Sequence, residues 1–185
     1  MLLRRHLILL IVCWSAPTLA FWDPVTSECR PPALEGTATA IDGHTLKSTR
    51  VNGLVDIIRL VSIDAPELHQ DCRIDGEWWS CGFEARQTLD DLLADADLTC
   101  LPCGYESDGA ITALCRSGET DIGAEVLRAG MATSYAFFAN NLQSAEGQAV
   151  TAGRGVWQGD WVHPTQWRQG TRLREGPCVA CYIPR

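Results

Sequence analysis

Residues 55–67 (VDIIRLVSIDAPE) decide the fold and carry the candidate site. The first nine residues of this stretch are rich in Val, Ile and Leu, which predicts a strand, and Pro66 ends it. Arg59, Asp64 and Glu67 stand along the strand and just after it. Taken alone, these charged residues also have a purely structural explanation, in which Arg59 pairs with Asp64 and Glu67 caps the following loop.

The chain on either side of this strand completes an order of elements. Upstream, two β-like segments, 37–41 and 45–51, flank Asp42-Gly43, a dipeptide typical of hairpin turns. Downstream, apolar residues at helical spacing predict helices, and turn signals bound two short strands. The helices are expected at 83–93, 121–127 and 141–152, and the two strands at 98–101 and 111–115. The order predicts an α+β fold and is that of a five-stranded barrel carrying helices, but by itself it leaves several α+β folds open.

The first twenty residues have the pattern of a secretory signal peptide. Arg4 and Arg5 precede an apolar run, 7–14, that is too short to span a membrane, which takes about 20 residues. Small residues then lead to a predicted cut after Ala20; a lipid anchor on Cys13 and a buried N-terminal helix are the alternatives. We therefore expect export to a periplasmic or secreted location. The expected parts are a signal peptide, a leader, one domain and a tail, at 1–20, 21–35, 36–168 and 169–185.

The mature chain is acidic. The whole sequence carries a formal charge of −8, and removing residues 1–20, which hold two arginines and no acidic residue, changes it to −10. Lys47 is the single lysine. Proteins that bind nucleic acid strongly use a basic face to neutralise phosphates, so this balance argues against strong, general nucleic-acid binding.

Eight of the nine cysteines remain after the expected cleavage. An even number in an exported chain of this size predicts a disulfide framework. Two CxxC pairs leave a zinc site as an alternative, which their long separation and the oxidising compartment disfavour. The eight are Cys29, Cys72, Cys81, Cys100, Cys103, Cys115, Cys178 and Cys181.

Short motifs follow one another between residues 41 and 168. They are IDGHT at 41–45, RLVSIDAPE at 59–67, CG-x2-A at 81–85, EGQA and GVW at 146–157, and P-x2-WR at 164–168. Together they resemble the motifs of the staphylococcal-type (thermonuclease) nucleases, and the last is similar to the tail of the secreted bacterial branch. The resemblance covers about residues 36–168 and implies an OB-type barrel with three helices.

The resemblance implies calcium-assisted hydrolysis of phosphodiester bonds in DNA or RNA. Carboxylates hold Ca²⁺, a cation that prefers oxygen ligands, a glutamate positions the attacking water, and two arginines stabilise charge on the phosphate. Carried over residue by residue, it makes Arg59 the first arginine, Asp64 a calcium ligand and Glu67 the water-positioning residue.

Two positions depart from this pattern. The second aspartate of the family's hairpin is His44, whose imidazole is a poor calcium ligand and suits zinc, copper or nickel. The second arginine is Ala110, close to the acidic Asp108. Arg116 lies six residues further on, about 20 Å away along a predicted strand, and is a poor substitute. Because loss of one such donor costs about 10²- to 10³-fold in rate, we expect a degenerate site with weakened calcium binding.

The secreted relatives also imply cysteine pairs. We expect disulfides Cys72–Cys81 and Cys100–Cys115 and no free thiol in the mature protein. The partners of the other four cysteines stay open.

The first functional hypothesis is an exported nuclease-fold protein with a degenerate site and a binding role. OB barrels accept oligosaccharides as well as oligonucleotides, and Trp78 and Trp79 either stack on sugar rings or pack on the barrel. The chain is also similar to exported nuclease-like proteins of exopolysaccharide (succinoglycan) biosynthesis, which implies a role in that process.

The second hypothesis is a metal-dependent phosphodiesterase with weakened or altered metal use. His44 and His69 together with Asp64 and Glu67 would supply two imidazoles and two carboxylates, a set that suits a transition metal. The alternative for His69 is an ordinary exposed loop histidine. A purely structural role for a disulfide-braced barrel is the third possibility.

Overall fold

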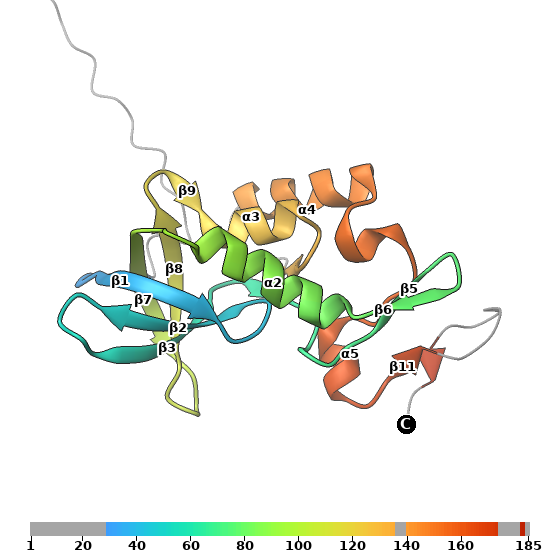
Figure 1. The fold of residues 1–185 in the computed structure, drawn as a ribbon, viewed down its shortest axis with the longest axis horizontal. Coiled ribbons are helices and arrows are strands. Elements are labelled where there is room, and N and C mark those ends of the chain that lie inside the picture. Colours follow the sequence, from blue (N-terminus) through green and yellow to red (C-terminus); the bar gives the residue numbers. More distant parts are fainter. Residues whose placement is uncertain (1–28, 136–139, 174–181, 184–185) are drawn as a thin grey trace, which may run out of the picture.

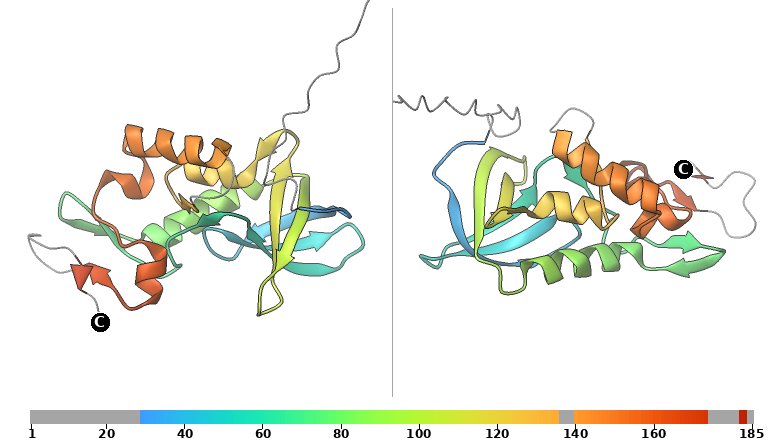
Figure 2. Two further views of the ribbon diagram at one scale, coloured as in Figure 1. Left: turned by 180° about the vertical axis from the view of Figure 1, so that it is seen from behind. Right: turned by 90° about the horizontal axis from the view of Figure 1, so that it is seen from above.

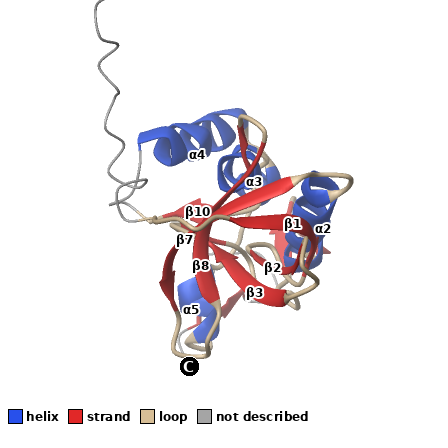
Figure 3. Cartoon of the chain, turned by 90° about the vertical axis from the view of Figure 1, so that its left-hand side faces the viewer, coloured by secondary structure: helices blue, strands red, loops and turns tan. Residues whose placement is uncertain are grey.

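Five strands close into a barrel in the computed structural model, which describes residues 29–135, 140–173 and 182–183 (Figure 1). The strands follow the order β3-β2-β1-β7-β8, and a parallel pairing of β3 with β8 joins the two edges. Figure 3 shows the five strands arranged around a common interior. They are β1 (Leu34–Ala40), β2 (Thr45–Arg50), β3 (Val55–Leu60), β7 (Leu98–Tyr105) and β8 (Ile111–Ser117). The predicted α+β fold with an OB-type barrel is confirmed.

One expected strand is two strands in the structure. The sequence predicts a single strand over 55–63, but β3 ends at Leu60 and a separate β4 (Ile63–Asp64) follows. Between them, Ser62 has a left-handed backbone conformation with φ of 66°, which a continuous strand does not accommodate. The break lets β4 pair with β10 (Thr133–Ser134) instead of continuing the barrel.

Two of the predicted helices pack against the barrel. α2 (Cys81–Leu93) buries one face, including Leu89, as its apolar spacing requires. α3 (Ile122–Arg128) is capped by Asp121, whose carboxylate accepts a hydrogen bond from the backbone N–H of Ala124. The cap replaces one of the hydrogen bonds that the first turn of a helix lacks.

The C-terminal part of the described chain adds three more helical elements. They are α4 (Asn140–Ala152), a 3₁₀ helix η1 (Gly155–Gln158) and α5 (Pro164–Arg168). The described residues thus hold four α-helices, one more than the expected three or so. The additional helix, α5, has five residues, which is too short to give a periodic apolar signal.

The segment between Cys72 and Cys81, for which the sequence predicts neither a strand nor a helix, forms a hairpin. Its strands are β5 (Cys72–Ile74) and β6 (Glu77–Trp79), and a disulfide joins the two cysteines at its base. Three further short strands complete the described chain: β9 (Thr120–Asp121), β11 (Arg172–Leu173) and β12 (Tyr182–Ile183).

Three disulfides brace the described part of the chain. Cys72 pairs with Cys81 and Cys100 with Cys115, as the resemblance implies, and Cys29 pairs with Cys103. Since Cys100 and Cys103 have different disulfide partners, the first CxxC pair is not a zinc site. Cys178 and Cys181 lie outside the described residues, as do residues 1–20, so the signal peptide and its cleavage site stay predictions.

After η1, the chain returns to the side of the β5–β6 hairpin (Figures 1 and 2). The guanidinium of Arg73 pairs with Asp160 at 2.7 Å, and the backbones of the same two residues exchange hydrogen bonds. This return brings α5 next to the end of β4, far from it in sequence. No helix among the described residues is long and apolar enough to cross a membrane.

Candidate functional site

The turn between β1 and β2 forms one wall of a cleft. The Oδ1 atom of Asp42 accepts the backbone N–H groups of His44 at 2.9 Å and Thr45 at 2.7 Å, an Asx turn that fixes the loop. A Cβ atom at Gly43 would lie 2.6 Å from the Cβ of Ala65, so only glycine lets the turn pack this closely. The turn therefore holds His44 at the cleft.

Asp64 forms the floor of the cleft at the end of β4. The residue is 1% exposed, and its strand pairs with Thr133 of β10. A carboxylate removed from water to this extent requires a cation or several hydrogen bonds. The structure supplies both, from α5.

The loop that carries Glu67 is fixed by Gln70 and by the start of α2. Gln70 is fully buried, and its side chain accepts the N–H of Glu67 at 3.2 Å and donates to the carbonyl of Val162 at 2.6 Å. A Cβ atom at Gly82 would lie 1.7 Å from the carbonyl oxygen of Glu67. The glycine thus allows α2 to begin directly against the loop, and Gln70 ties the loop to the segment before α5.

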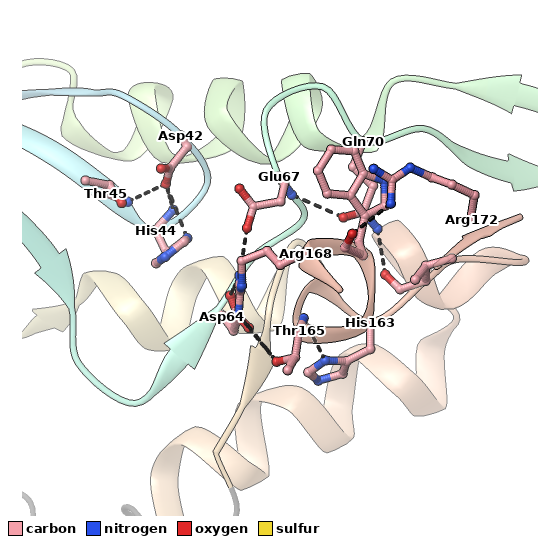
Figure 4. A network of polar contacts seen from close by, with 12 residues as sticks. Asp42, His44, Thr45, Asp64, Glu67, Gln70, His163, Thr165, Arg168 and Arg172 are labelled. Atoms are coloured by element: carbon pink, nitrogen blue, oxygen red, sulfur yellow. Dashed lines mark hydrogen bonds and ion pairs between the residues drawn. The ribbon is translucent and has the colours of Figure 1, made fainter. Parts of the chain in front are cut away.

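Arg168 extends from α5 between Asp64 and Glu67 (Figure 4). Its Nη1 donates to Asp64 Oδ1 at 3.0 Å and to Glu67 Oε1 at 2.7 Å, and its Nη2 donates to Asp64 Oδ2 at 2.7 Å and more weakly to the Thr165 hydroxyl at 3.4 Å. These contacts, those with Asp64 first, raise the pKa of Arg168 above its usual value. The arrangement is a two-pronged arginine–carboxylate pair with a second carboxylate on the same guanidinium.

Arg59, on β3, makes a second such pair at the rim. Its Nη1 and Nη2 atoms donate to Oδ1 and Oδ2 of Asp108 at 3.0 and 2.6 Å. The hydrogen bonds from Arg59 and then from the backbone N–H of Ala110 lower the pKa of Asp108 to about 2. The side chain of Asp108 is 57% exposed and that of Arg59 31%, so this pair is open to water.

Two further groups complete the walls. His44 Nδ1 lies 3.2 Å from Asp42 Oδ1, on the opposite side of the cleft from Arg168 (Figure 4). Tyr135 follows β10 and its backbone N–H donates to the carbonyl of Ser62. Partial burial and then the negative charge of Asp64 raise the pKa of its hydroxyl.

The resulting cleft has a volume of about 360 Å³. Its lining holds four carboxylates and two guanidinium groups, which gives a formal charge of −2 with the histidine neutral. The lining residues are Asp42, His44, Thr45, Arg59, Asp64, Glu67, Glu106, Tyr135 and Arg168. The structure thus brings Arg59, His44, Asp64 and Glu67 together at one site.

Other expected site residues lie elsewhere. Ala110 is buried and lines a neighbouring cavity with Val55 and Ile57. His69 is exposed and lines a different cavity, beside Phe83. The four-residue transition-metal set that included His69 is therefore wrong. In the ranges that the structure describes, no three His, Cys, Asp or Glu side chains are grouped to hold a metal ion.

The two neighbouring tryptophans have different surroundings. Trp78 is 47% exposed, and the guanidinium of Arg73 lies 5.7 Å from its ring centroid. Trp79 is partly buried and packs against the disulfide between Cys72 and Cys81. Of the pair, Trp78 is the one that presents an aromatic surface to solvent.

Two residues that organise the site, Arg168 and Gln70, have no role that the sequence predicts. The signal for Arg168 was its place in the P-x2-WR motif, which marked the position without indicating its contacts. Gln70 stands three residues after Glu67 in a polar loop, and its burial follows only from the return of the C-terminal segment.

Comparison with known proteins gives one family. Residues 57–159 match the model of the staphylococcal nuclease homologue family, which is more than half of the chain. A search of curated proteins found no match.

Proposed function

Because the chain belongs to the family of staphylococcal nuclease homologues, we propose that it is an exported member that no longer hydrolyses phosphodiesters with calcium and instead binds a ligand. One observation carries this proposal. The acidic groups that the family uses with calcium, Asp64 and Glu67, are both paired with the chain's own Arg168.

The residues present do not fit the calcium ion that the family implies. Calcium takes six to eight oxygen ligands, but both oxygens of Asp64 and one of Glu67 accept hydrogen bonds from a guanidinium. The hairpin position opposite them is His44, whose nitrogen atoms are poor calcium ligands. We therefore derive no catalytic step through a metal ion.

The groups that would stabilise a phosphate are also altered. Phosphoryl transfer depends on fixed positive charge around the phosphate oxygens. Arg59 is paired with Asp108, and Ala110, in place of the second arginine, lines a neighbouring cavity. A lining with a formal charge of −2 repels an anionic substrate. Weak or absent nuclease activity is the expected consequence.

An oligosaccharide of low charge density is the ligand class that this chemistry favours. The acidic cleft and the mature charge of −10 disfavour polyanions, whereas sugars stack on exposed aromatic rings such as Trp78. A role in exopolysaccharide (succinoglycan) biosynthesis is consistent with an exported, disulfide-braced barrel. The three disulfides of the described chain suit an oxidising compartment.

One observation favours the alternative, a metal-dependent phosphodiesterase with altered metal use. Two arginines, Arg59 and Arg168, line the same cleft as Asp64 and Glu67. In this alternative, Arg168 takes the part of the missing second arginine. Its hydrogen bonds oppose that assignment, since four of its five N–H donors point at Asp64, Glu67 and Thr165.

A nuclease assay separates the two functions. The mature protein and a Glu67→Ala variant are incubated with DNA and RNA in the presence of Ca²⁺, Mg²⁺ or Zn²⁺, and acid-soluble nucleotides are measured. We expect no metal-stimulated release by the wild type beyond that of the variant. Robust hydrolysis that the Glu67→Ala change abolishes would establish the phosphodiesterase instead.

The ligand class is tested separately by calorimetry with purified exopolysaccharide fragments. We expect binding that Trp78→Ala weakens, with a Phe83→Ala variant as a control, since Phe83 is equally exposed but lies on α2. Equal loss in both variants would indicate a non-specific apolar effect and contradict a sugar site at Trp78.

A further inference from the structure

A positive group lies where two carboxylates of the cleft converge. Asp64 is almost fully buried, and Glu67 approaches from the loop on the other side of the guanidinium (Figure 4). Three carboxylate oxygens accept hydrogen bonds from Arg168, at 2.7 to 3.0 Å. Oxygen atoms that converge in this way are what a divalent cation requires.

The chain holds this guanidinium in place from several sides. The Thr165 hydroxyl contacts both Asp64 and Arg168, and the imidazole of His163 accepts the N–H of Thr165 at the start of α5. The buried side chain of Gln70 ties the Glu67 loop to the carbonyl of Val162. Arg168 therefore projects from a fixed short helix and not from a free tail.

We propose that the guanidinium of Arg168 replaces the divalent cation of the family: it neutralises Asp64 and Glu67 and keeps calcium out of the cleft. The inference rests on the proposed function and deepens it, because it names the residue that removes the metal. In this view the loss of calcium binding is caused mainly by Arg168, and His44 adds to it.

Removal of the guanidinium has two consequences. Three carboxylate oxygens lose their donors, and the formal charge of the cleft changes from −2 to −3. Both changes favour a divalent cation, since calcium affinity rises with the number of charged ligands. A methionine at position 168 keeps much of the length of the arginine side chain without its charge.

The experiment titrates Ca²⁺ alone into the mature wild type, Arg168→Met and Arg168→Lys by calorimetry. We expect Arg168→Met to bind Ca²⁺ with a Kd of about 10⁻⁴ to 10⁻³ M, the range of extracellular calcium modules, and at least about tenfold more tightly than the wild type. Arg168→Lys keeps the positive charge and should stay close to the wild type. Asp64→Asn in the Arg168→Met background should abolish the gained binding.

Thermal unfolding with and without Ca²⁺ gives a second readout. Calcium should raise the Tm of Arg168→Met, because a ligand that binds only the folded state stabilises it, and should leave the wild-type Tm unchanged. Should Arg168→Met unfold without calcium, refolding on addition of Ca²⁺ supports the inference. A variant that stays unfolded in calcium, while Asp64→Asn/Arg168→Met folds, contradicts it.

Two results overturn the inference. One is a folded Arg168→Met variant that binds calcium no better than the wild type; the other is an Arg168→Lys variant that gains as much affinity as Arg168→Met. Neither result decides the proposed loss of nuclease activity, which is contradicted if the wild type cleaves nucleic acid in a way that depends on Glu67.

Discussion

Two arginine–aspartate pairs of the same geometry have their arginines in one cleft, and they differ in the burial of the carboxylate. In each pair both Nη atoms of the arginine donate to the two oxygens of one aspartate. The side chain of Asp64, the partner of Arg168, is 2% exposed, and that of Asp108, the partner of Arg59, is 57% exposed.

This difference decides what each pair does. Water can replace Arg59 around Asp108, so the pair at the rim is weak and can exchange with an incoming anion. Water cannot replace Arg168 around Asp64, so loss of that arginine leaves a buried, uncompensated charge. The exposed pair of Arg59 and Asp108 therefore affects how a ligand binds at the rim of the cleft. The buried pair of Arg168 and Asp64 determines whether the fold is stable without a metal ion.

The largest expected effect is that of breaking the buried pair. Arg168→Met should lower the free energy of unfolding in calcium-free urea titrations by about 2 to 3 kcal/mol. This is less than the usual cost of about 3–5 kcal/mol for breaking a buried pair, because the guanidinium itself is 42% exposed.

The matched control removes both charges. Asp64→Asn/Arg168→Met leaves no unpaired buried charge and should recover at least half of the lost free energy. A double variant as unstable as Arg168→Met alone would show that packing of the arginine, and not its charge, stabilises the cleft.

The corresponding change at the rim should affect ligand affinity more than the free energy of unfolding. Asp108→Asn should leave the urea midpoint unchanged within error, because its carboxylate is exposed. It also releases Arg59 and removes one negative charge from the rim, so inorganic phosphate should bind several-fold more tightly, by about 1 kcal/mol or less. Calorimetry with phosphate measures this, and Arg59→Gln/Asp108→Asn is the control that should lose the gain.

The pH dependence of the rim pair is the third prediction. Hydrogen bonds from Arg59 and then from the backbone N–H of Ala110 lower the pKa of Asp108 from the ordinary 3.8 to about 2. The contribution of this pair to stability, which is small because the carboxylate is exposed, is fully present above pH 3.8 and is lost as the pH falls through about 2. NMR of the Asp108 carboxyl carbon should show this titration, and Arg59→Gln should raise the pKa toward 3.8, although the hydrogen bond from the Ala110 N–H still lowers it in part. An unchanged titration in Arg59→Gln would mean that the pair does not persist in solution.

The smallest expected effect is that of salt. Raising the ionic strength from about 0.1 to 1 M shortens the screening length from about 10 to 3 Å. The pKa of Asp108 should rise toward its ordinary value in high salt, while the destabilisation caused by Arg168→Met should change little. Equal salt sensitivity of the two pairs would contradict the difference in burial between Asp64 and Asp108.

The local part of the structure could be predicted from the sequence. The β1–β2 hairpin, the helix over 83–93 and the cap at Asp121 follow from turn chemistry and apolar spacing, which depend on neighbouring residues only. The break at Ser62 and the hairpin between Cys72 and Cys81 were not predicted. A left-handed serine has no strong local signal, and a strand of three residues has too few positions to show alternation.

By itself the sequence determined the barrel and the acidic, arginine-containing site, because Arg59, Asp64 and Glu67 lie within nine residues of one another. It also identified two departures from the family pattern, at His44 and Ala110. Only the tertiary structure decided what Asp64 and Glu67 bind. Arg168 is 104 residues from Asp64 in the chain, and its contact depends on the path of the chain after α4, which is fixed by long-range pairs and not by local pattern.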